Sequence, residues 1–560
     1  MKQRAIFSNS SSRKHISGAN HTPNGITRRE FIATATLAAS SHALFGQNSS
    51  NRLAHDRHRP QYHLMPPANW MNDPNGPLYW KGRYHMFYQY ADVISNSATK
   101  YWGHAVSRDM VHWKNLGIAL APTPGGPDKD GCWTGSAVVY NGVPTIVYTG
   151  ATWSQESERA ARAAGFVPER QMVAVAADPN DVDLLQWSKI PQDPVLAAPP
   201  VGIKAVGWRD PCVWREGADW YMTIGCGELG KGGMALLYTS KNLRSWKYLH
   251  PLAVARPDPN AHGPAMAFRS MWECPDFFIL QGQPILLVAA GNAYLTGSYS
   301  NHFFHRQKEG RIDFGTAAYA QKTMEDDQGR RIWWAWLHEK RSMKAQVEAG
   351  WAGVMSLPKH LTLRSDGMLG MNPVDELRVL RRRARNVAPQ QIDASSPLLL
   401  KGISGDCVEI EAEIDPGDAK QCGLRVRSTA DGSEQTLIGY DRKTQMLFSD
   451  TTHSSKDPET ATPSRIFANR GVTQGALNLG TEPLRLRVFV DASVLETFAN
   501  GRASLSDRVY PLSPASLGIG LFAKGGSAQL RSMTVWDLAP ISDNRLTSGA
   551  ELFRVGLLNA

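Results

Sequence analysis

Between residues 60 and 365 the hydrophobic positions come in short runs, rich in aromatic and β-branched residues, and a turn signal ends each run. Many of these runs are paired across two or three turn-forming residues, as in GPLYW-KG-RYHMFYQY, SAVVY-NG-VPTIVYTG, CVWR-EGA-DWYMTIGC and FFIL-QGQ-PILLVAAG. Two β-type runs joined by so short a connection predict a β-hairpin. We therefore expect this part of the chain to consist of successive hairpins.

A second pattern recurs downstream of the hairpins. VSRDMVHWKNL (106–116) and TSKNLRSWKYL (239–249) share a Ser, an Asp or Asn, an apolar residue and a Trp-Lys pair, and DLLQWSKI (183–190) is a looser copy. All-β units repeated at intervals of roughly 60 residues are typical of the four-stranded blades of a propeller. The repeated Trp113 and Trp246 are expected to pack inside blades. Five hairpin starts predict five blades, near Pro77, Ser136, Cys212, Phe277 and Ile332.

From about residue 397 the pattern changes to longer alternating strands such as CVEIEAEI, LRLRVFVD and LGIGLFAK, without the Trp-Lys repeat. Regularly spaced strands of this kind favour a β-sandwich. The sequence therefore predicts an all-β protein, a five-bladed β-propeller (60–370) followed by a C-terminal β-sandwich (397–540). A linker (371–396) that includes the helix-like VDELRVLRRRARN (374–386) would join them, and 541–560 would form a tail.

Composition agrees with two soluble domains, since 560 residues exceed one ordinary core and 42% of them are hydrophobic. The net charge of +10 is uneven along the chain. Residues 1–59 carry nine Lys or Arg against two acids, which leaves +3 for the other 501 residues. The sequence therefore gives no reason to expect a nucleic-acid partner.

The basic segment at the start is explained by TRREFI (27–32), which precedes the weakly apolar ATATLAASSHALFG (33–46) with a small-residue cleavage site at Ser41-His42-Ala43. This order is typical of a twin-arginine signal peptide, here 1–46. The apolar run is too short for a permanent membrane span. We expect a protein exported by the twin-arginine machinery to the periplasm or the medium; the alternative is a disordered basic tail.

Cysteine usage indicates no metal finger and no disulfide framework. The six cysteines form no CxxC pair, so buried free thiols are expected. One disulfide bond in an oxidising compartment remains an alternative. No pattern calls for a metal ion or an organic cofactor, and none indicates an oligomeric state. Cys274 has no His partner in its motif and is expected to be a packing residue.

Three acids stand at equivalent places, each beside a proline turn that introduces a hairpin: Asp73 in NDP, Asp210 in RDP and Glu273 in WECP. Because the first strand of each propeller blade lines the central channel, these carboxylates are expected to converge on one axial pocket. Converging acids serve either as ligands of a hard cation or as acid/base and nucleophilic groups on a sugar. Three independent turn acids are the structural alternative.

The neighbouring residues favour sugar chemistry, because flat aromatic faces and polar side chains suit sugar rings and their hydroxyls. The aromatic residues near these turns are Trp70, Trp102, Trp133, Trp208 and Trp272, and the polar ones are Asn72, Gln89, His104 and Arg209.

At this level of detail the chain resembles glycoside hydrolase family 32, the family of invertases, levanases and inulinases. The matching motifs, in order, are WMNDPNG (70–76), YQY (88–90), WGHAVS (102–107), WTGSAV (133–138), GWRDP (207–211), MWECPDFF (271–278) and GWAGVMSLP (350–358). DASVLETFANGRASLSDRVYP (491–511) is similar to the signature of that family's sandwich. The resemblance thus extends from about Tyr62 to Pro511.

The resemblance implies a retaining β-fructofuranosidase that acts on sucrose or fructans through a covalent fructosyl-enzyme. Asp73 would be the nucleophile, Glu273 the general acid/base and Asp210 the transition-state stabiliser. Like charges at short range, with Trp272 adding desolvation, would raise one carboxyl pKa. The implied substrate-binding residues are Asn72, Gln89, Trp102, Trp133, Thr134, Arg209 and Trp70.

The sequence also departs from the family pattern. ADVISNSATKY (91–101) stands where many relatives carry Asn-Pro and a further Trp, and Trp133-Thr134-Gly135 replaces Phe-Ser-Gly. Both changes fall at the pocket mouth. A fructosyltransferase, an inverting arabinan- or xylan-active furanosidase and a non-catalytic sugar-binding propeller remain as alternatives. Glu496 in the sandwich is expected to contact the propeller or a ligand, or to be a surface acid.

Overall fold

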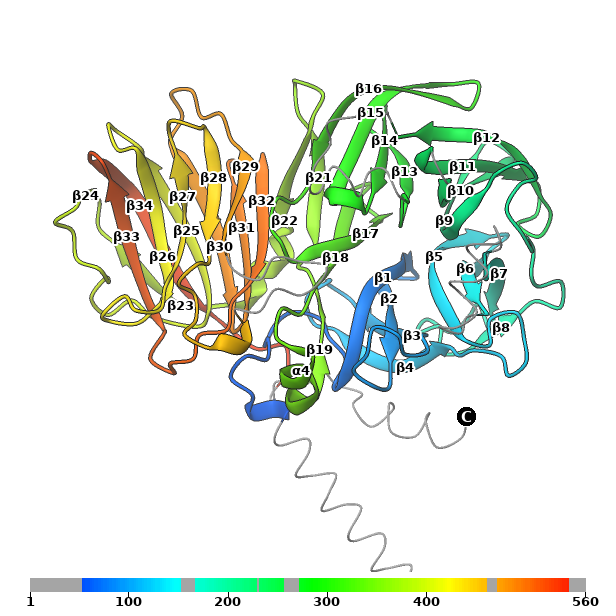
Figure 1. The fold of residues 1–560 in the computed structure, drawn as a ribbon, viewed down its shortest axis with the longest axis horizontal. Helices are drawn as coiled ribbons and strands as arrows, with labels where there is room; N and C mark the ends of the chain where they lie inside the picture. The colour runs from blue at the N-terminus through cyan, green and yellow to red at the C-terminus, as the bar shows by residue number, and fades with distance from the viewer. Residues whose placement is uncertain (1–52, 153–166, 229–230, 256–270, 461–470, 543–560) are drawn as a thin grey trace, which may run out of the picture. The chain divides into compact units, whose positions relative to one another are not determined.

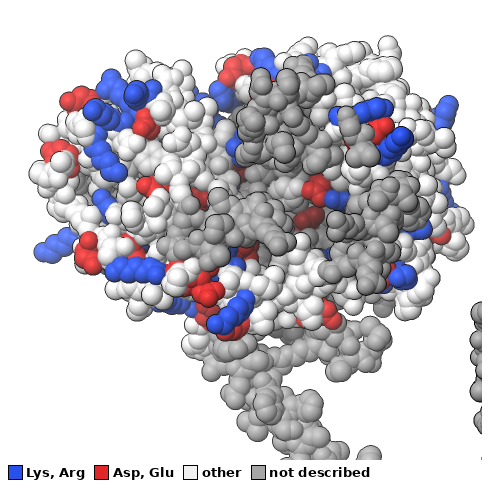
Figure 2. All heavy atoms as spheres, in the orientation of Figure 1, with Lys and Arg blue, Asp and Glu red and all other residues white. Residues whose placement is uncertain are grey.

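The computed structural model describes residues 53–152, 167–228, 231–255, 271–460 and 471–542 (Figure 1). The predicted signal peptide (1–46) and nearly all of the predicted tail (541–560) lie outside these ranges. The described residues belong to one compact unit. Within the described ranges no helix is long and apolar enough to cross a membrane. On the face shown in Figure 2, basic and acidic side chains are interspersed.

The first part of the described chain forms five antiparallel sheets, which are the blades of a propeller. Each of the first four blades contains four consecutive strands. Their bounds are β1 Asn69–Trp80, β2 Arg83–Ala91, β3 Tyr101–Ser107 and β4 Lys114–Leu120; β5 Gly131–Tyr140, β6 Val143–Ala151, β7 Glu169–Ala176 and β8 Trp187–Lys189; β9 Ala205–Glu216, β10 Asp219–Glu228, β11 Gly232–Ser240 and β12 Trp246–Val254; β13 Asp276–Leu280, β14 Gln283–Val288, β15 Ala293–Ser300 and β16 Phe303–Arg311.

The fifth blade is also where the ring closes. It contains β17 Ala318–Glu325, β18 Arg331–Leu337, β21 Lys359–Leu363 and β22 Leu369–Pro373. Between β18 and β21 the chain forms helix α4 (Met343–Ala349) and the short strands β19 (Trp351–Ala352) and β20 (Val354–Met355). β19 pairs parallel with β1 of the first blade, whereas β20 pairs with β18. This segment therefore joins the last blade to the first.

The first strands of all five blades meet at the axis, as predicted. Residues of β1, β5, β9, β13 and β17 line one cavity of about 530 Å³, farther along these strands than the three predicted acids. Four of the predicted hairpin starts lie in first strands, but Ile332 lies in the second strand, β18. The fifth blade begins instead at Ala318. The prediction missed this start because the first strand, AYAQKTME, lacks the aromatic run that marks the other blades.

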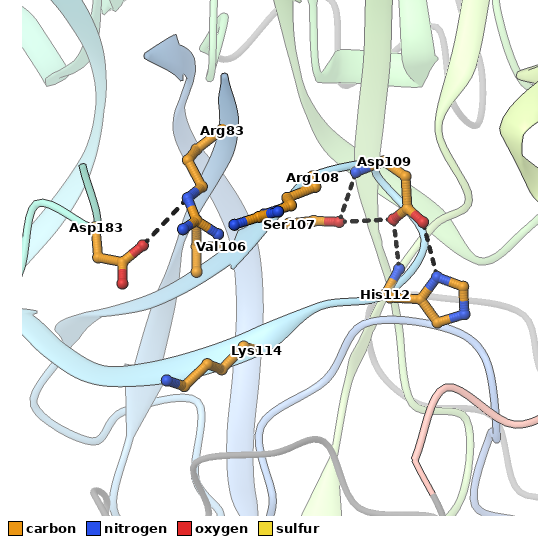
Figure 3. A pocket seen from close by; sticks show the side chains of 8 residues that line it. All are labelled: Arg83, Val106, Ser107, Arg108, Asp109, His112, Lys114 and Asp183. Atoms are coloured by element: carbon orange, nitrogen blue, oxygen red, sulfur yellow. Dashed lines mark hydrogen bonds and ion pairs between the residues drawn. The ribbon is translucent and has the colours of Figure 1, made fainter. Parts of the chain in front are cut away.

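The repeated Trp-Lys element forms the same turn in three blades. Each tryptophan indole donates a hydrogen bond to the carbonyl three residues earlier, and that earlier residue has a positive φ. The pairs are Trp113 with Met110 (φ 60°), Trp187 with Leu184 (φ 49°) and Trp246 with Leu243 (φ 60°). Figure 3 shows the first copy, in which Asp109 accepts from Ser107 and His112. Trp113 and Trp246 are packing residues of the blades, as expected.

The second part of the described chain is a β-sandwich of two sheets whose facing sides form one hydrophobic core. The larger sheet has the order β23-β34-β25-β30-β31-β32, and β24 also pairs with β34; the smaller has the order β29-β28-β27-β26-β33. The strands are β23 Arg381–Val387, β24 Gln390–Ile392, β25 Cys407–Asp415, β26 Gln421–Ser428, β27 Thr436–Asp441, β28 Met446–Asp450, β29 Val472–Ala476, β30 Leu484–Asp491, β31 Val494–Ala499, β32 Ala503–Arg508, β33 Gly518–Lys524 and β34 Ala528–Leu538.

The predicted helical linker is wrong over most of its length. A short 3₁₀ helix, η2 (Asp375–Leu380), is followed at once by β23 and β24, which both pair with β34. Arginine is a good helix former, but here ladder pairing and ion pairs override local propensity. Arg381 bonds both oxygens of Glu409 on β25, at 2.6 and 2.7 Å. The sandwich sheet therefore begins at Arg381. The other 3₁₀ helices are η1 Ala290–Asn292 and η3 Pro458–Thr460.

Propeller and sandwich share a buried cluster of charges centred on Glu496 of β31. Its carboxylate accepts from Leu357 N at 2.7 Å and His63 Nε2 at 3.1 Å, and Lys359 Nζ lies at 3.2 Å. Lys359 also pairs with Asp313 at 2.8 Å. Of the roles predicted for Glu496, the structure supports the contact with the propeller, because its side chain is fully buried.

The cysteines agree with the expectation of free thiols. All six lie in the described ranges and form no disulfide there, and only Cys407 is partly exposed. Cys274 is buried, and burial raises the pKa of its thiol. A neutral buried thiol fits the packing role expected for this residue.

Candidate active site

The three predicted acids stand at one level of the axial channel. Asp73 lies in β1, Asp210 lies in β9, and Glu273 lies just before β13, so each comes from the first strand of a different blade or from its start. The sulfur of Cys274 is 3.7 Å from Asp73 Oδ2 and 3.6 Å from Asp210 Oδ2. One thiol thus touches two of the acids and directly follows the third in the chain. The structure brings all three together.

The turn signals at Asp73 and Asp210 form β-bulges and not turns, whereas Glu273 lies in the segment before β13. β1 runs through the whole of WMNDPNG, and its register with β2 shifts between Met71 and Pro74, at Asn72 and Asp73. β9 likewise continues through Asp210, and its register with β10 shifts beside that residue. Pro and Gly inside a strand commonly mark bulges, which re-aim a side chain near a site. The predicted turns at Asp73 and Asp210 are therefore wrong, because both places are bulges within a strand. The bulges still direct the acid side chains, as expected of the turns.

The backbone has an unusual conformation at two positions of the site. Asp210 has a φ of 66° and Cys274 a φ of 49°, values in the left-handed region that residues other than glycine seldom adopt. Such conformations cluster at functional sites, where surrounding contacts maintain them. Here the Cys274 amide donates to Asp210 Oδ2 at 2.9 Å, so the two unusual residues hold each other.

Asp73 is held at both carboxylate oxygens. Thr134 Oγ1 donates to Oδ2 at 2.6 Å, and Asn72 Nδ2 donates to Oδ1 at 3.1 Å. Burial raises the pKa of Asp73, the hydrogen bonds from Thr134 and Asn72 counteract that rise, and the charge of Glu273 adds to it. These two donors orient a carboxylate that still has lone pairs for a reacting carbon.

Asp210 is the most deeply buried of the three acids. Burial raises its pKa to about 7, Arg209 opposes that shift, and the charges of Asp73 and Glu273 increase it. The Arg209 Nε atom is 3.9 Å from Asp210 Oδ2. Burial therefore favours the protonated form of this carboxyl group more than in an exposed aspartate.

Glu273 is partly accessible, with its side chain 31% exposed. Arg209 Nη2 lies 2.5 Å from Oε1, and Tyr319 Oη donates to Oε2. Arg209 also bonds the buried Glu169 at 3.1 Å and lies over the half-buried ring of Trp133. Arg209 is thus the cation shared by the acids of the site.

Some predicted substrate-binding residues lie beside the acids. Trp70 donates its indole N–H to Asn72 Oδ1 at 2.8 Å, and Asn72 in turn bonds Asp73. Five predicted residues therefore surround Asp73 and Glu273, and we call them the rim of the site: Trp70, Asn72, Thr134, Trp133 and Arg209. Their contacts with a sugar remain predictions.

Other predicted aromatic contacts are not available to a ligand. Trp102 is 0% exposed and packs with Phe87 and Tyr148, because it lies on the third strand of its blade, away from the axis. Trp208 and Trp272 are also fully buried. The prediction that these three rings offer a face to a sugar is wrong. They are core residues, which aromatic composition alone cannot distinguish from a binding platform.

The predicted polar contacts Gln89 and His104 are buried as well. The Gln89 amide donates to the Cys132 carbonyl at 3.1 Å, so in this structure it satisfies a backbone group. His104 lies 3.0 Å from His85 and stacks on Phe87. Gln89 stays a predicted subsite residue, whereas His104 belongs to the blade core.

Sequence reasoning missed two residues that bond site residues, Tyr319 and Glu169, and a third, Lys100, that lies beside Trp70. Tyr319 was missed because the first strand of the fifth blade was not recognised, and Glu169 because it stands alone at the start of β7. The third, Lys100, lies in the segment that departs from the family pattern, and that departure was the feature of the sequence that could have pointed to it. A further pocket of about 410 Å³, formed by the first blade and Asp183 of the second, contains none of the predicted site residues (Figure 3).

Comparison with known proteins agrees with this geometry. Residues 63–373 match the glycosyl hydrolases family 32 N-terminal domain, and residues 376–537 match the family 32 C-terminal domain. The chain belongs to glycosyl hydrolase family 32. The resemblance inferred from the motifs is therefore confirmed, as is the fold of propeller and sandwich. As a member of family 32 the protein is a glycosidase, and the alternative of a non-catalytic sugar-binding propeller is set aside.

Within family 32 the relatives include enzymes with different named substrates. The chain is 32% identical over 500 residues to the sucrose-6-phosphate hydrolase of Escherichia coli, with 86% of this chain and 94% of the relative covered. It is 32% identical over 558 residues to the levanase of Bacillus subtilis (strain 168), with 92% and 75% covered. The crystal structure of fructan 1-exohydrolase IIa from Cichorium intybus superposes with a TM-score of 0.74 at 27% identity, covering 87% of this chain and 98% of that one.

Proposed function

We propose that this family 32 enzyme is a retaining β-fructofuranosidase that removes terminal β-D-fructofuranosyl residues from sucrose or fructans. The observation that carries the proposal is the meeting of Asp73, Asp210 and Glu273 at one level of the axis, with one sulfur touching two of them. The named activities of the relatives, on sucrose-6-phosphate, levan and fructan, share the fructosyl unit and support it.

In the first step an Asp73 oxygen attacks the anomeric carbon of the fructosyl unit while the bond to the leaving oxygen breaks. Glu273 delivers a proton to that leaving oxygen. The products are a fructosyl ester of Asp73 and a released alcohol. Retaining enzymes place these two carboxyl groups about 5 to 5.5 Å apart, which allows direct attack without an intervening water.

In the second step a water molecule attacks the same carbon, and Glu273, now a carboxylate, accepts its proton. The ester bond to Asp73 breaks, and fructose leaves with its configuration retained. Asp210 accepts hydrogen bonds from ring hydroxyls, which strengthen as positive charge develops on the sugar. Arg209, paired with Glu169 at 3.1 Å, keeps the three acids from repelling one another.

Product analysis tests the reaction. The purified enzyme is expected to release fructose from sucrose, inulin or levan, with the β-anomer formed first in proton NMR. Release of the opposite anomer would identify an inverting furanosidase. Transfer products that dominate at high sucrose concentration would identify a fructosyltransferase. No fructose from any of the three substrates would overturn the proposal.

Two substitutions separate the proposed roles. Asp73→Ala is expected to abolish turnover of every fructoside, because no ester can form. Glu273→Ala should still react with an aryl fructoside, whose leaving group needs no proton, and should accumulate the fructosyl ester on Asp73. Mass spectrometry of the intact protein detects that ester. An unmodified Glu273→Ala protein together with an active Asp73→Ala protein would contradict the assignment.

We also propose export through the twin-arginine pathway to the periplasm or the medium. TRREFI at 27–32, the apolar run and the small residues of 41–43 support it. Cell fractionation tests the pathway. Replacing Arg28 and Arg29 together by Lys, at unchanged charge, is expected to retain the enzyme inside the cell. The matched control replaces Arg4 and Arg13 by Lys and should be exported as the wild type is; equal export of both double variants would contradict the pathway.

A further inference from the structure

The segment between β2 and β3 stands at the same end of the first blade as the acids. Trp70 at the start of β1 pairs with Ala91 at the end of β2, and Tyr90 pairs with Tyr101 at the start of β3. Residues 92–100 therefore leave the blade on the side where Asp73 lies. This is also the segment in which the sequence departs from its family.

Lys100 ties this segment into a closed loop. Its side chain is buried, with the residue 6% exposed, and its ammonium group donates to the carbonyls of Ser95 (3.3 Å), Asn96 (3.0 Å) and Ala98 (2.8 Å). An ammonium group has three protons, and three carbonyl oxygens accept them. A buried charge satisfied in this way is costly to remove, so it determines the conformation of the loop.

The same ammonium lies against the rim of the active site. It is 5.7 Å from the ring centroid of Trp70, whose indole bonds Asn72, which bonds Asp73. Burial lowers the pKa of Lys100 to about 8, and the negative charge of Asp73 opposes that shift. Ile94 and Ala98 of the loop pack on the cluster that contains Trp70.

The backbone of Lys100 secures the opposite wall. Its carbonyl accepts from Cys132 N at 2.9 Å, and Lys100 forms a bridge with Gly131. Both neighbours directly precede Trp133 and Thr134 of the site. One residue therefore connects the loop of the first blade to the start of the second blade, near the residues of both blades that bond Asp73.

We propose that Lys100 is a positioning residue that holds residues 92–99 as a wall of the subsite for the leaving group, and so sets the preference of the enzyme among leaving sugars. The inference rests on the proposed fructosidase activity. The fructosyl unit itself is held at the axis by the three acids, whereas the loop stands farther out, where the next sugar of the substrate must lie.

The test compares two substrates that differ in their leaving group, sucrose and a nitrophenyl β-D-fructofuranoside. In Lys100→Met the KM for sucrose is expected to rise about tenfold, while kcat/KM for the aryl fructoside stays within about twofold. Partition of the fructosyl-enzyme to added sucrose, relative to water, should fall by a similar factor, because the acceptor uses the same subsite. Lys114→Met, at an exposed position of β4, is the matched control and should change neither value.

The outcomes are distinct. An equal loss with both substrates would show that Lys100 acts on Asp73 and would overturn the proposal, as would an unchanged KM for sucrose and unchanged transfer. Lys100→Arg, which keeps the charge but cannot serve all three carbonyls with its planar group, should give an intermediate KM and covers the case in which Lys100→Met does not fold. If the wild type releases no fructose from either substrate, the proposed function fails and not the role of Lys100.

Discussion

The guanidinium group of Arg209 lies 2.5 Å from the carboxylate of Glu273 and 3.1 Å from that of Glu169. Glu273 comes from the start of the fourth blade and Glu169 from the second, so Arg209 of the third blade bridges its two neighbours. This bridge joins the proposed general acid, Glu273, to a cation and a second acid from two other blades.

Replacing the guanidinium group of Arg209, which bonds two carboxylates, is expected to impair catalysis more than folding. Arg209→Lys keeps the charge but cannot bond two carboxylates in a plane, so kcat/KM should fall about 10- to 100-fold. Steady-state kinetics with sucrose measures it. Arg215→Lys, on the same strand but exposed, is the control. Equal activities of the two variants would show that the bridge does not position Glu273.

Asp210 is expected to lower stability at neutral pH. Burial raises its pKa to about 7, so between its ordinary value of 3.8 and about 7 the folded state binds more protons than the unfolded state. Stability contributed by this group therefore falls as pH rises through that window. Asp210→Asn should raise the melting temperature at pH 7.5, by a margin that shrinks towards pH 4, while activity is lost. A lower melting temperature at pH 7.5 would contradict this.

The Glu496 cluster is expected to stabilise the protein. Burial raises the pKa of Glu496, but Lys359 and His63 outweigh it, and the net shift is downward. Its contribution is thus present above the ordinary value of 4.5 and is lost as pH falls. Glu496→Ala leaves Lys359 without one of its two acids and should cost about 3 to 5 kcal/mol at pH 7. Denaturant unfolding compares it with Glu482→Ala, an exposed control; equal losses would contradict the prediction.

Lys100 provides a pH readout of the loop. Burial lowers its pKa to about 8, against the raising effect of the charge of Asp73, and its ammonium group otherwise faces the Trp70 ring and the loop carbonyls. Above pH 8 the amine loses a proton, and its bonds to three carbonyls weaken. The KM for sucrose should then rise in the wild type, whereas Lys100→Arg should show no such rise. Parallel profiles would contradict the prediction.

Much of the fold could be predicted because its signals are local. Hairpin pairs and the Trp-Lys turn mark four blades, and alternating strands mark the sandwich. Arg381–Val387 was misread because an arginine-rich run has no local feature that separates a helix from a strand whose ion pairs lie on β25. The start of the fifth blade was missed for a similar reason, since Ala318–Glu325 becomes a strand through its neighbours.

The candidate site divides in the same way. Asp73, Asp210 and Glu273 were found because each stands in a motif that repeats from blade to blade. Trp102 looked equally suitable, yet the third strand of its blade carries it into the core. Tyr319 and Lys100 had no motif, because their importance comes from partners far away or across a loop.

The sequence by itself determined the all-β architecture, the three acids and the family. Strand periodicity, turn-forming residues and contiguous motifs depend only on residues that are close together in the chain. The tertiary structure alone decided which aromatic rings are buried in the blade cores, that the proline turns at Asp73 and Asp210 are bulges within strands, and that Arg209 and Lys100 connect separate walls of the site. These features depend on where strands from different blades meet, and burial and charge pairing at those meetings are set by residues distant in the chain.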